Sequence, residues 1–190
     1  FTPGAMVLTD RGEVAVEDLA EGDLVLTRDS GFQPIRWVGR RDLTAAELAA
    51  EPRFNPVRIA QGALGGKLPE RDMLVSPQHR MLLTGARAEL LFGEHEVLVA
   101  ATHMVGMAGV DRVMPASISY IHILFDRHEV VRADGAWSES FQPGMRTITG
   151  LEAAQRAELL ALFPNLDQGE TYPAARLALK AREAQVLLRG

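Results

Sequence analysis

The chain has 190 residues, no cysteine and a formal net charge of −5, and 47% of its residues are hydrophobic. This length and apolar content allow one domain with a sizeable core, and the lack of cysteine excludes disulfides, thiolate metal sites and an internal cysteine nucleophile. The acidic balance argues against nucleic acid as a partner, and no segment reads as a signal peptide or a membrane-spanning helix.

The first sixty residues are typical of an all-β domain, because short apolar segments alternate with turn residues. Thr44 and Glu47 have the spacing of a capping box, which predicts a short helix over 45–50. A glycine-rich loop follows over 61–70. We predict strands at 6–9, 13–17, 24–27, 33–39 and 56–59.

The most informative segment runs from Arg71 to Met81 and contains a Ser76-Pro77 turn with His79 three residues after the serine. If the chain is extended after the turn, His79 shares a face with Met81, and a hydroxyl and an imidazole lie together beside a core face. Such a pair can polarise a carbonyl or protonate a leaving amine. A core histidine after a turn serine would give the same residues, so this second interpretation stays open.

The second half begins with two further predicted strands, at 89–93 and 97–101, and we expect the flanking His95 and His103 at solvated or edge positions. A longer strand is predicted from Tyr120, and Asp-Gly at 134–135 predicts a hairpin turn. In a regular strand His122 and His128 would lie roughly 20 Å apart, so both could serve one bond only if the segment bends.

The last forty residues change character and predict helices. Thr149 and Glu152 again have capping-box spacing, followed by a helix over 153–163, and Pro173 opens a second helical run to Leu188. We therefore expect a mainly β domain over 1–148 and a C-terminal helical appendage over 149–190 packed on it.

Four segments, taken in order, are similar to the motifs of one known family. Phe1-Thr2-Pro3-Gly4 resembles the family's start, which a cysteine normally precedes. Val16-Glu17-Asp18-Leu19 with Gly22-Asp23 resembles the next family segment. Ser76-Pro77-Gln78-His79 is similar to its Thr-x-x-His motif, and the segment from His128 to Gly135 to its late block. Together they resemble the Hint (hedgehog/intein) superfamily, most closely its bacterial branch, which implies a horseshoe-like β-fold with a short helical insert.

The resemblance implies self-cleavage by an N-to-S acyl shift, in which a cysteine before Phe1 attacks the preceding carbonyl. It assigns His79 as the acid for the departing nitrogen, with Ser76 holding the carbonyl and the histidine. His122 or Asp126 would deprotonate the thiol, whose usual pKa is about 8.5. The resemblance also singles out Phe1 as the junction, His128 near the second junction and Asp72 as a possible orienting residue. The sequence explains Asp72 better as a turn carboxylate.

Two departures from the family pattern narrow this expectation. The chain from Phe1 contains no cysteine, so by itself it cannot form the thioester. Glu139-Ser140 stands where inteins end in His-Asn, and serine cannot cyclise as asparagine does. We therefore expect hedgehog-like cleavage at the N-terminal junction instead of full splicing, with the domain's own upstream polypeptide as substrate and no cofactor or metal.

Two other functions remain open from the sequence alone. A degenerate Hint fold could act as a non-catalytic binding or structural module of a larger bacterial protein. A histidine-based metal hydrolase is the other, but His122 and His128 are six residues apart and no carboxylate–histidine cluster of the usual spacing accompanies them.

Overall fold

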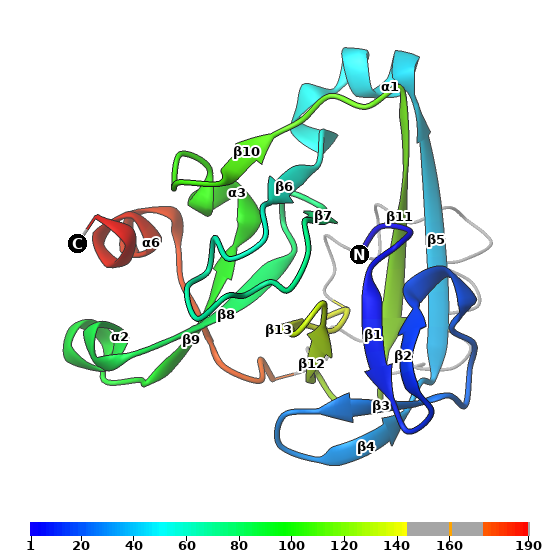
Figure 1. Ribbon diagram of the computed structural model, residues 1–190, viewed down its shortest axis with the longest axis horizontal. Coiled ribbons are helices and arrows are strands. Elements are labelled where there is room, and N and C mark those ends of the chain that lie inside the picture. The colour runs from blue at the N-terminus through cyan, green and yellow to red at the C-terminus, as the bar shows by residue number, and fades with distance from the viewer. Residues whose placement is uncertain (144–159, 161–172, 190) are drawn as a thin grey trace.

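The computed structural model describes residues 1–143, 160 and 173–189 (Figure 1). The described helices are η1 (Val16–Asp18), α1 (Ala45–Ala50), η2 (Pro52–Phe54), α2 (Ala86–Phe92), α3 (Ala101–Met104) and α6 (Ala181–Leu188). The described strands are β1 (Met6–Thr9), β2 (Gly12–Ala15), β3 (Leu24–Thr27), β4 (Gly31–Pro34), β5 (Trp37–Thr44), β6 (Val57–Ile59), β7 (Met73–Val75), β8 (Arg80–Thr84), β9 (Glu96–Ala100), β10 (Val110–Arg112), β11 (Ser117–Leu124), β12 (Val130–Ala133), β13 (Ala136–Glu139) and β14 (Leu177–Ala178). The expected mainly β fold with a short helical insert is confirmed.

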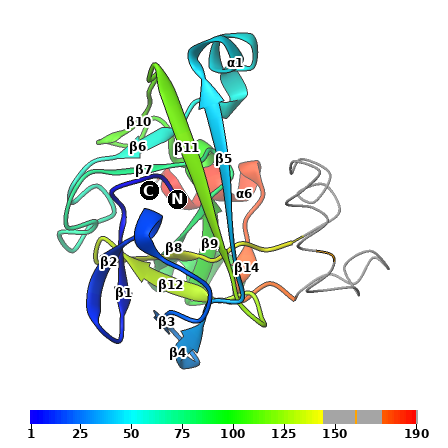
Figure 2. The same cartoon turned by 90° about the vertical axis from the view of Figure 1, so that its right-hand side faces the viewer.

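Three sheets organise the described part of the chain. The largest has nine strands in the order β14-β9-β8-β13-β12-β1-β3-β4, with β2 paired to β1. A small sheet has the order β10-β6-β7, and β5 and β11 form a two-stranded ribbon. The two long strands of this ribbon lie side by side in Figures 1 and 2, close to the N-terminal segment. The ribbon thus forms one wall of the region around the start of the chain.

Several local predictions are confirmed with their expected mechanisms. Thr44 caps α1: its hydroxyl accepts the Glu47 N–H, and the Glu47 carboxylate accepts the Thr44 N–H at 2.8 Å. Asp134 and Gly135 connect β12 to β13 with φ values of 48° and 76°. Positive φ at both turn residues is the requirement of a type I′ hairpin, for which Asp-Gly is well suited.

The predicted strand over 33–39 is wrong in its continuity, because the chain changes sheets in its middle. β4 ends at Pro34, and β5 begins at Trp37 in the other sheet. The two residues between the strands bind different parts of the chain. The Ile35 N–H donates to the Asp23 carbonyl, and the Arg36 N–H donates to the Leu124 carbonyl in β11. The strand over 13–17 also ends early, since η1 begins at Val16.

The predicted strand over 89–93 is also wrong, because these residues belong to the helix α2. Gly85 precedes the helix, and Gly93 ends it in the left-handed conformation at φ 72°. Leu90 is 85% exposed, so the apolar run that suggested a buried strand lies largely on the surface. Four good helix formers at 86–89 outweigh the short apolar run.

The C-terminal prediction is partly corrected. The helix expected over 153–163 falls outside the described residues. The run expected from Pro173 becomes helical only at Ala181, and before it β14 pairs in parallel with β9. Leu177, which lies within the predicted helical run, is exposed in β14, while Leu179 is buried.

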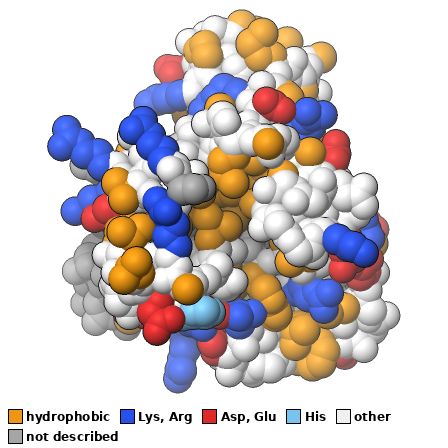
Figure 3. Space-filling view, turned by 60° about the vertical axis from the view of Figure 1, so that its left-hand side comes forward, with side chains coloured by type: hydrophobic (Ala, Val, Ile, Leu, Met, Phe, Trp, Pro, Cys, Tyr) orange, Lys and Arg blue, Asp and Glu red, His pale blue; other side chains and the backbone are white. Residues whose placement is uncertain are grey.

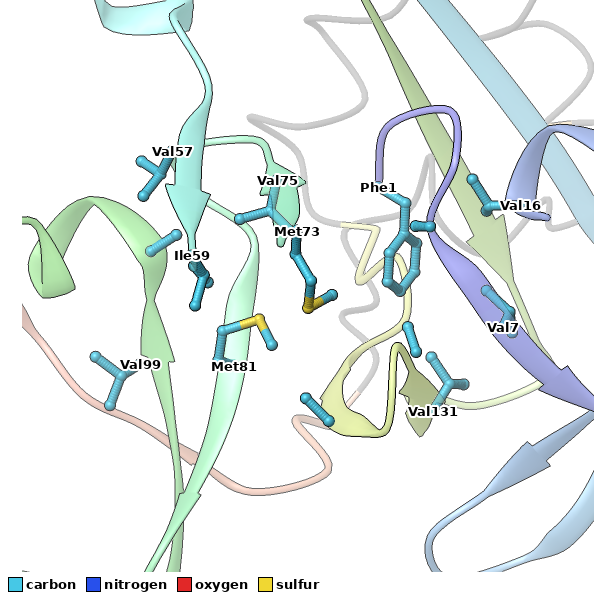
Figure 4. Close-up of a cluster of buried hydrophobic side chains, with 14 of the residues drawn as sticks. Phe1, Val7, Val16, Val57, Ile59, Met73, Val75, Met81, Val99 and Val131 are labelled. Atoms are coloured by element: carbon cyan, nitrogen blue, oxygen red, sulfur yellow. The ribbon is translucent and has the colours of Figure 1, made fainter. Parts of the chain in front are cut away.

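The main cluster of buried apolar side chains draws on the large sheet, the small sheet and β11, and the N-terminal residue is part of it. Phe1 is 3% exposed, and Figure 4 shows its ring between the strand that carries Val7 and the side chain of Met73. None of the described helices is long and apolar enough to cross a membrane. Burial of Phe1 fixes where the chain enters the domain.

Candidate functional site around Phe1

The first residue is held in place by its backbone. The Phe1 nitrogen donates to the Ile121 carbonyl, and the Ile121 N–H donates to the Phe1 carbonyl, both at 2.9 Å. This reciprocal exchange is the pattern of an antiparallel hydrogen-bonded pair, so the N-terminus runs along the free edge of β11. The buried Thr2 hydroxyl adds a bond of 2.8 Å to the Leu74 carbonyl in β7. The start of the chain is thereby fixed between the ribbon and the small sheet.

The predicted Ser-Pro turn carries His79 to this place. The His79 N–H donates to the Ser76 carbonyl at 3.0 Å, which closes the turn. The first amides of α3 hold the same loop, because Ala101 donates to the His79 carbonyl and Thr102 to the Pro77 carbonyl, both at 2.9 Å. Backbone bonds on both sides therefore fix the position of the imidazole.

The His79 ring packs against the junction residue. Its centroid lies 4.6 Å from that of the Phe1 ring, in an edge-on arrangement. Burial lowers the pKa of His79 well below its usual value, and the charges of the N-terminus, His122, Arg80 and His128 act in the same direction. Its Nε2 is buried without a hydrogen-bond partner among residues 1–143, 160 and 173–189. The site therefore holds a neutral imidazole next to Phe1, with one ring nitrogen that has no partner among these residues.

The nitrogen of Phe1 lies in the same low-dielectric surroundings. Burial lowers the pKa of its amino group to about 5, and the nearby Glu139 carboxylate opposes this shift. Ionised amines are disfavoured when they lose their hydration. This position therefore favours an uncharged nitrogen.

His122 extends from β11 next to the pair formed by Phe1 and Ile121. Its ring lies 4.9 Å from that of Phe141, and burial, followed by the charge of the N-terminus, lowers its pKa to about 3. The Phe141 N–H donates to the Ile123 carbonyl at 2.9 Å. Phe1 and Phe141 thus occupy successive positions along one edge of β11, about 7 Å apart along the strand.

His128 reaches the same region because the segment between His122 and His128 bends. In a straight strand the two histidines would lie too far apart. β11 ends at Leu124 and β12 begins at Val130. The His128 side chain is fully buried, and its Nε2 lies 3.3 Å from Oε2 of Glu139 in a contact that falls short of hydrogen-bond geometry. Glu139 in turn accepts the Arg80 N–H at 3.0 Å and pairs with the Arg80 guanidinium at 2.9 Å.

Two of the proposed carboxylates lie outside this cluster. Asp126 is exposed and pairs with Arg36 at 3.2 Å. Asp72 is exposed as well, and it accepts the Gln61 N–H at 2.8 Å, as a turn carboxylate does. Ser76 is half-buried and contributes its carbonyl to the turn. The structure thus brings together Phe1 and the three histidines 79, 122 and 128, while it directs the two aspartates elsewhere.

Sequence reasoning missed the partners that hold the cluster. Thr2 was noted only as part of the segment that resembles the family's start, and Glu139 only as a departure from the intein ending. Both were visible as polar residues directly beside predicted site segments, but their partners lie 72 and 59 residues away in sequence. The two other histidines behave differently: His95 is exposed as expected, whereas the His103 Nδ1 is buried.

A separate apolar hollow lies away from Phe1, on the side of α2 and α6. Figure 3 shows hydrophobic side chains on the floor of a depression on that side. A pocket of about 270 Å³ there is lined by Leu64, Leu68, Leu82, Leu83, Thr84, Gly85, Arg87, Ala88, Met107, Ala136, Trp137 and Leu187. Within the described ranges, no group of three or more histidine and acidic side chains is arranged to hold a metal ion.

The buried start of the chain, the turn histidine and the β11 edge define a domain of the Hint type. The Hint domain family model matches residues 1–145, and the chain belongs to this family. This membership supports an autoprocessing-type domain. No curated protein is similar enough in sequence to match the chain.

Solved structures similar to this chain include inteins and an intein-like domain. The AceL NrdHF class 3 split intein, in a splice inactive variant, is 15% identical, with 73% of this chain and 95% of that chain covered and a TM-score of 0.47. The N145AA variant of the MchDnaB-1 intein is 10% identical, with 74% of this chain and 98% of that chain covered and a TM-score of 0.47. The bacterial intein-like domain from Clostridium thermocellum is 13% identical, with 74% and 97% covered and a TM-score of 0.45.

Proposed function

We propose that this Hint domain cleaves the peptide bond upstream of its own start, by an N-to-S acyl shift to a cysteine placed directly before Phe1. The observation that carries the proposal is the backbone pairing of Phe1 with Ile121 beside the buried His79 imidazole. Our proposed boundary puts the self-cleaving domain at 1–148 and its appendage at 149–190. The polypeptide upstream of the domain is its substrate.

The surroundings of the Phe1 nitrogen support a continuing chain. An amino group there has its pKa lowered to about 5, so the site disfavours a charged nitrogen. A peptide N–H is uncharged and can donate the same bond to the Ile121 carbonyl. The position thus suits a peptide bond to a preceding residue.

The strand register directs that preceding residue to the histidines. In an antiparallel pair with Phe1 opposite Ile121, the residue before Phe1 comes opposite His122. One step further, the Ile123 carbonyl is already bound by Phe141. The upstream chain must therefore leave the β11 edge at the junction, next to His122 and Phe141.

The acyl shift needs three functions, and the cluster can supply them. The cysteine thiol gives its proton to His122, the sulfur forms a bond to the carbonyl carbon of the preceding residue, the C–N bond breaks, and the nitrogen takes a proton from His79 to become an amine. We assign proton donation to His79, whose Nε2 has no hydrogen-bond partner among the described residues. Because burial lowers the pKa of His79, its ring is neutral at rest and must first take up the proton that it donates. Ser76 would polarise the carbonyl. With a pKa of about 3, His122 is a weak base that can still accept a hydrogen bond from the thiol.

The test is a precursor in which a short folded tag and a cysteine precede Phe1. We expect release of the tag, accelerated by a thiol that captures the thioester, and loss of release in the variant with alanine in place of that cysteine. His79→Ala should slow release at least about a hundredfold, as expected for a lost general acid. His95→Ala is the matched control, because that exposed histidine pairs with Glu89 outside the cluster.

Two outcomes would contradict the proposal. Release that survives His79→Ala removes His79 from the mechanism. A well-folded precursor that shows no thioester and no release, with or without an added thiol, would favour the non-catalytic module instead. Asp126→Asn separates the two proposed bases, and since Asp126 is exposed and pairs with Arg36, we expect release at the unmodified rate.

A further inference from the structure

The C-terminal segment from Ala175 to Leu188 is joined to the domain, although it lies beyond the residues that the family model matches. β14 extends the large sheet by pairing with β9, and the Leu179 N–H donates to the Leu98 carbonyl at 2.9 Å. Figures 1 and 2 show this segment passing along β9 before it ends in α6. Ala184 of α6 is fully buried.

One side chain anchors the beginning of this segment. The Arg176 guanidinium binds both carboxylate oxygens of Asp29, at 2.7 and 2.9 Å, and its Nε donates to Glu96 at 2.7 Å. Arg28 pairs with the same Glu96. The planar guanidinium matches the geometry of a carboxylate, so its hydrogen bonds to Asp29 and Glu96 form at a small cost in side-chain entropy. The residue next to it is therefore held in a defined place.

That residue, Ala175, binds a histidine of the site. Its backbone N–H donates to Nδ1 of His128 at 3.0 Å. A nitrogen that accepts a hydrogen bond carries no proton, so in neutral His128 the proton must be on Nε2. A protonated ring, with N–H groups on both nitrogens, could not accept this bond.

The Nε2–H group of this tautomer faces the junction network. It lies 3.3 Å from the Glu139 carboxylate, which also receives the Arg80 N–H and guanidinium. Glu139 opposes the lowering of the pKa of the Phe1 amino group, so its charge reaches the start of the chain. The Nε2–H group of His128 thus lies beside a carboxylate whose charge acts on the Phe1 nitrogen.

We propose that the backbone of Ala175, anchored by Arg176, is a positioning element that fixes His128 as the Nε2–H tautomer. The Nε2–H group of His128 then lies beside Glu139, and His128 cannot act as a base at Nε2. The effect on the tautomer stands by itself, whereas its effect on cleavage rests on the proposed function above.

The first experiment measures the tautomer directly in the full chain. Histidine labelled with ¹⁵N is incorporated, and ¹H–¹⁵N correlation shows which ring nitrogen of His128 carries the proton. We expect a single Nε2–H form, and Ala175→Pro, which removes the donor, should convert it to a mixture or to the Nδ1–H form. Ala175→Gly keeps the donor and should keep the Nε2–H form.

A second variant covers the case in which proline disturbs folding. Arg176→Met loosens the anchor and leaves the Ala175 N–H in place, and it should shift the tautomer in the same direction. Ala174→Pro, at the exposed neighbouring position, is the control for proline itself. A His128 ring that is not Nε2–H in the native chain, or that stays Nε2–H in both the Ala175→Pro and Arg176→Met variants, overturns the proposal.

The cleavage experiment uses the precursor with cysteine before Phe1. Ala175→Pro should slow release about fivefold, the effect of one hydrogen bond of ~1 kcal/mol at 1.36 kcal/mol per tenfold change. A changed tautomer with an unchanged rate overturns the role in cleavage. If the unmodified precursor does not cleave at all, the proposed function fails, and the tautomer measurement still decides the inference.

Discussion

The contact between Gly39 and Trp37 gives a sharp test of the packing behind the site. Gly39 lies opposite His122 in the β5–β11 ribbon, and a Cβ added there would be 2.0 Å from Cη2 of the fully buried Trp37 ring. Carbon atoms in ordinary contact are about 3.5–4.0 Å apart, so the indole would have to move by at least ~1.5 Å. The ring can move only toward its neighbours, which include Phe141 at 5.9 Å.

We expect Gly39→Ala to lower the free energy of unfolding by about 3 kcal/mol, the upper end of the usual cost of overpacking. For a chain of this size, that corresponds to a fall in Tm of roughly 6–12 °C. Thermal unfolding followed by circular dichroism measures the loss. Tryptophan fluorescence reports the ring itself, because the chain has only two tryptophans.

A double-mutant cycle separates this clash from a general effect of alanine in β5. In a Trp37→Phe background the atoms nearest the new methyl group are absent, so the added cost of Gly39→Ala should fall below about 1 kcal/mol. Equal costs in the two backgrounds would refute the reasoning. So would a Gly39→Ala protein with native stability and unchanged fluorescence.

Three further predictions test single contacts. Thr2→Val leaves the Leu74 carbonyl without its bond and should cost about 1–2 kcal/mol in urea unfolding, while Thr2→Ser keeps the hydroxyl and should cost less. Thr44→Ala removes the cap of α1 and should cost about 1 kcal/mol without changing the rate of cleavage; a slower rate would contradict a purely local role. Burial raises the pKa of Asp134, so the folded state holds its proton to higher pH than the unfolded state, and stability should fall as pH rises from 3.8 through the raised pKa. Asp134→Asn should remove this slope, and an unchanged slope in unfolding measured against pH would contradict the assignment.

The local features that could be predicted from the sequence are those that a few adjacent residues determine. The cap at Thr44 needs only Glu47 three residues later, and the hairpin at Asp134 needs only Gly135. The turn before His79 is closed by Ser76 within the same segment. In each case the partner is so close in sequence that its spacing already specifies the contact.

The features that were missed depend on partners far along the chain. The residues at 177–178 have a helical pattern, but the edge of β9 offers backbone hydrogen bonds that a strand can use, and pairing there outweighs the pattern. Pro34 was expected near the beginning of a strand, but it is the last residue of β4. Two residues later the Arg36 N–H donates to the Leu124 carbonyl, and the chain continues beside β11. Tertiary contacts determine the secondary structure at these positions, and the spacing of residues in the sequence does not reveal those contacts.

The site itself arises from one such long-range arrangement. Phe1 and Phe141 are 140 residues apart, yet they bind adjacent carbonyls on the same edge of β11, at Ile121 and Ile123. If the domain cleaves upstream of Phe1 as proposed, it needs no separate substrate cleft, because the pairing of Phe1 with β11 places the preceding residue next to His122. The edge has room for either the upstream residues or Phe141 at Ile123, and Phe141 is there. In the proposed cleavage the upstream peptide would therefore turn away from the β11 edge before Phe1, so that the bond to be broken departs from the regular strand.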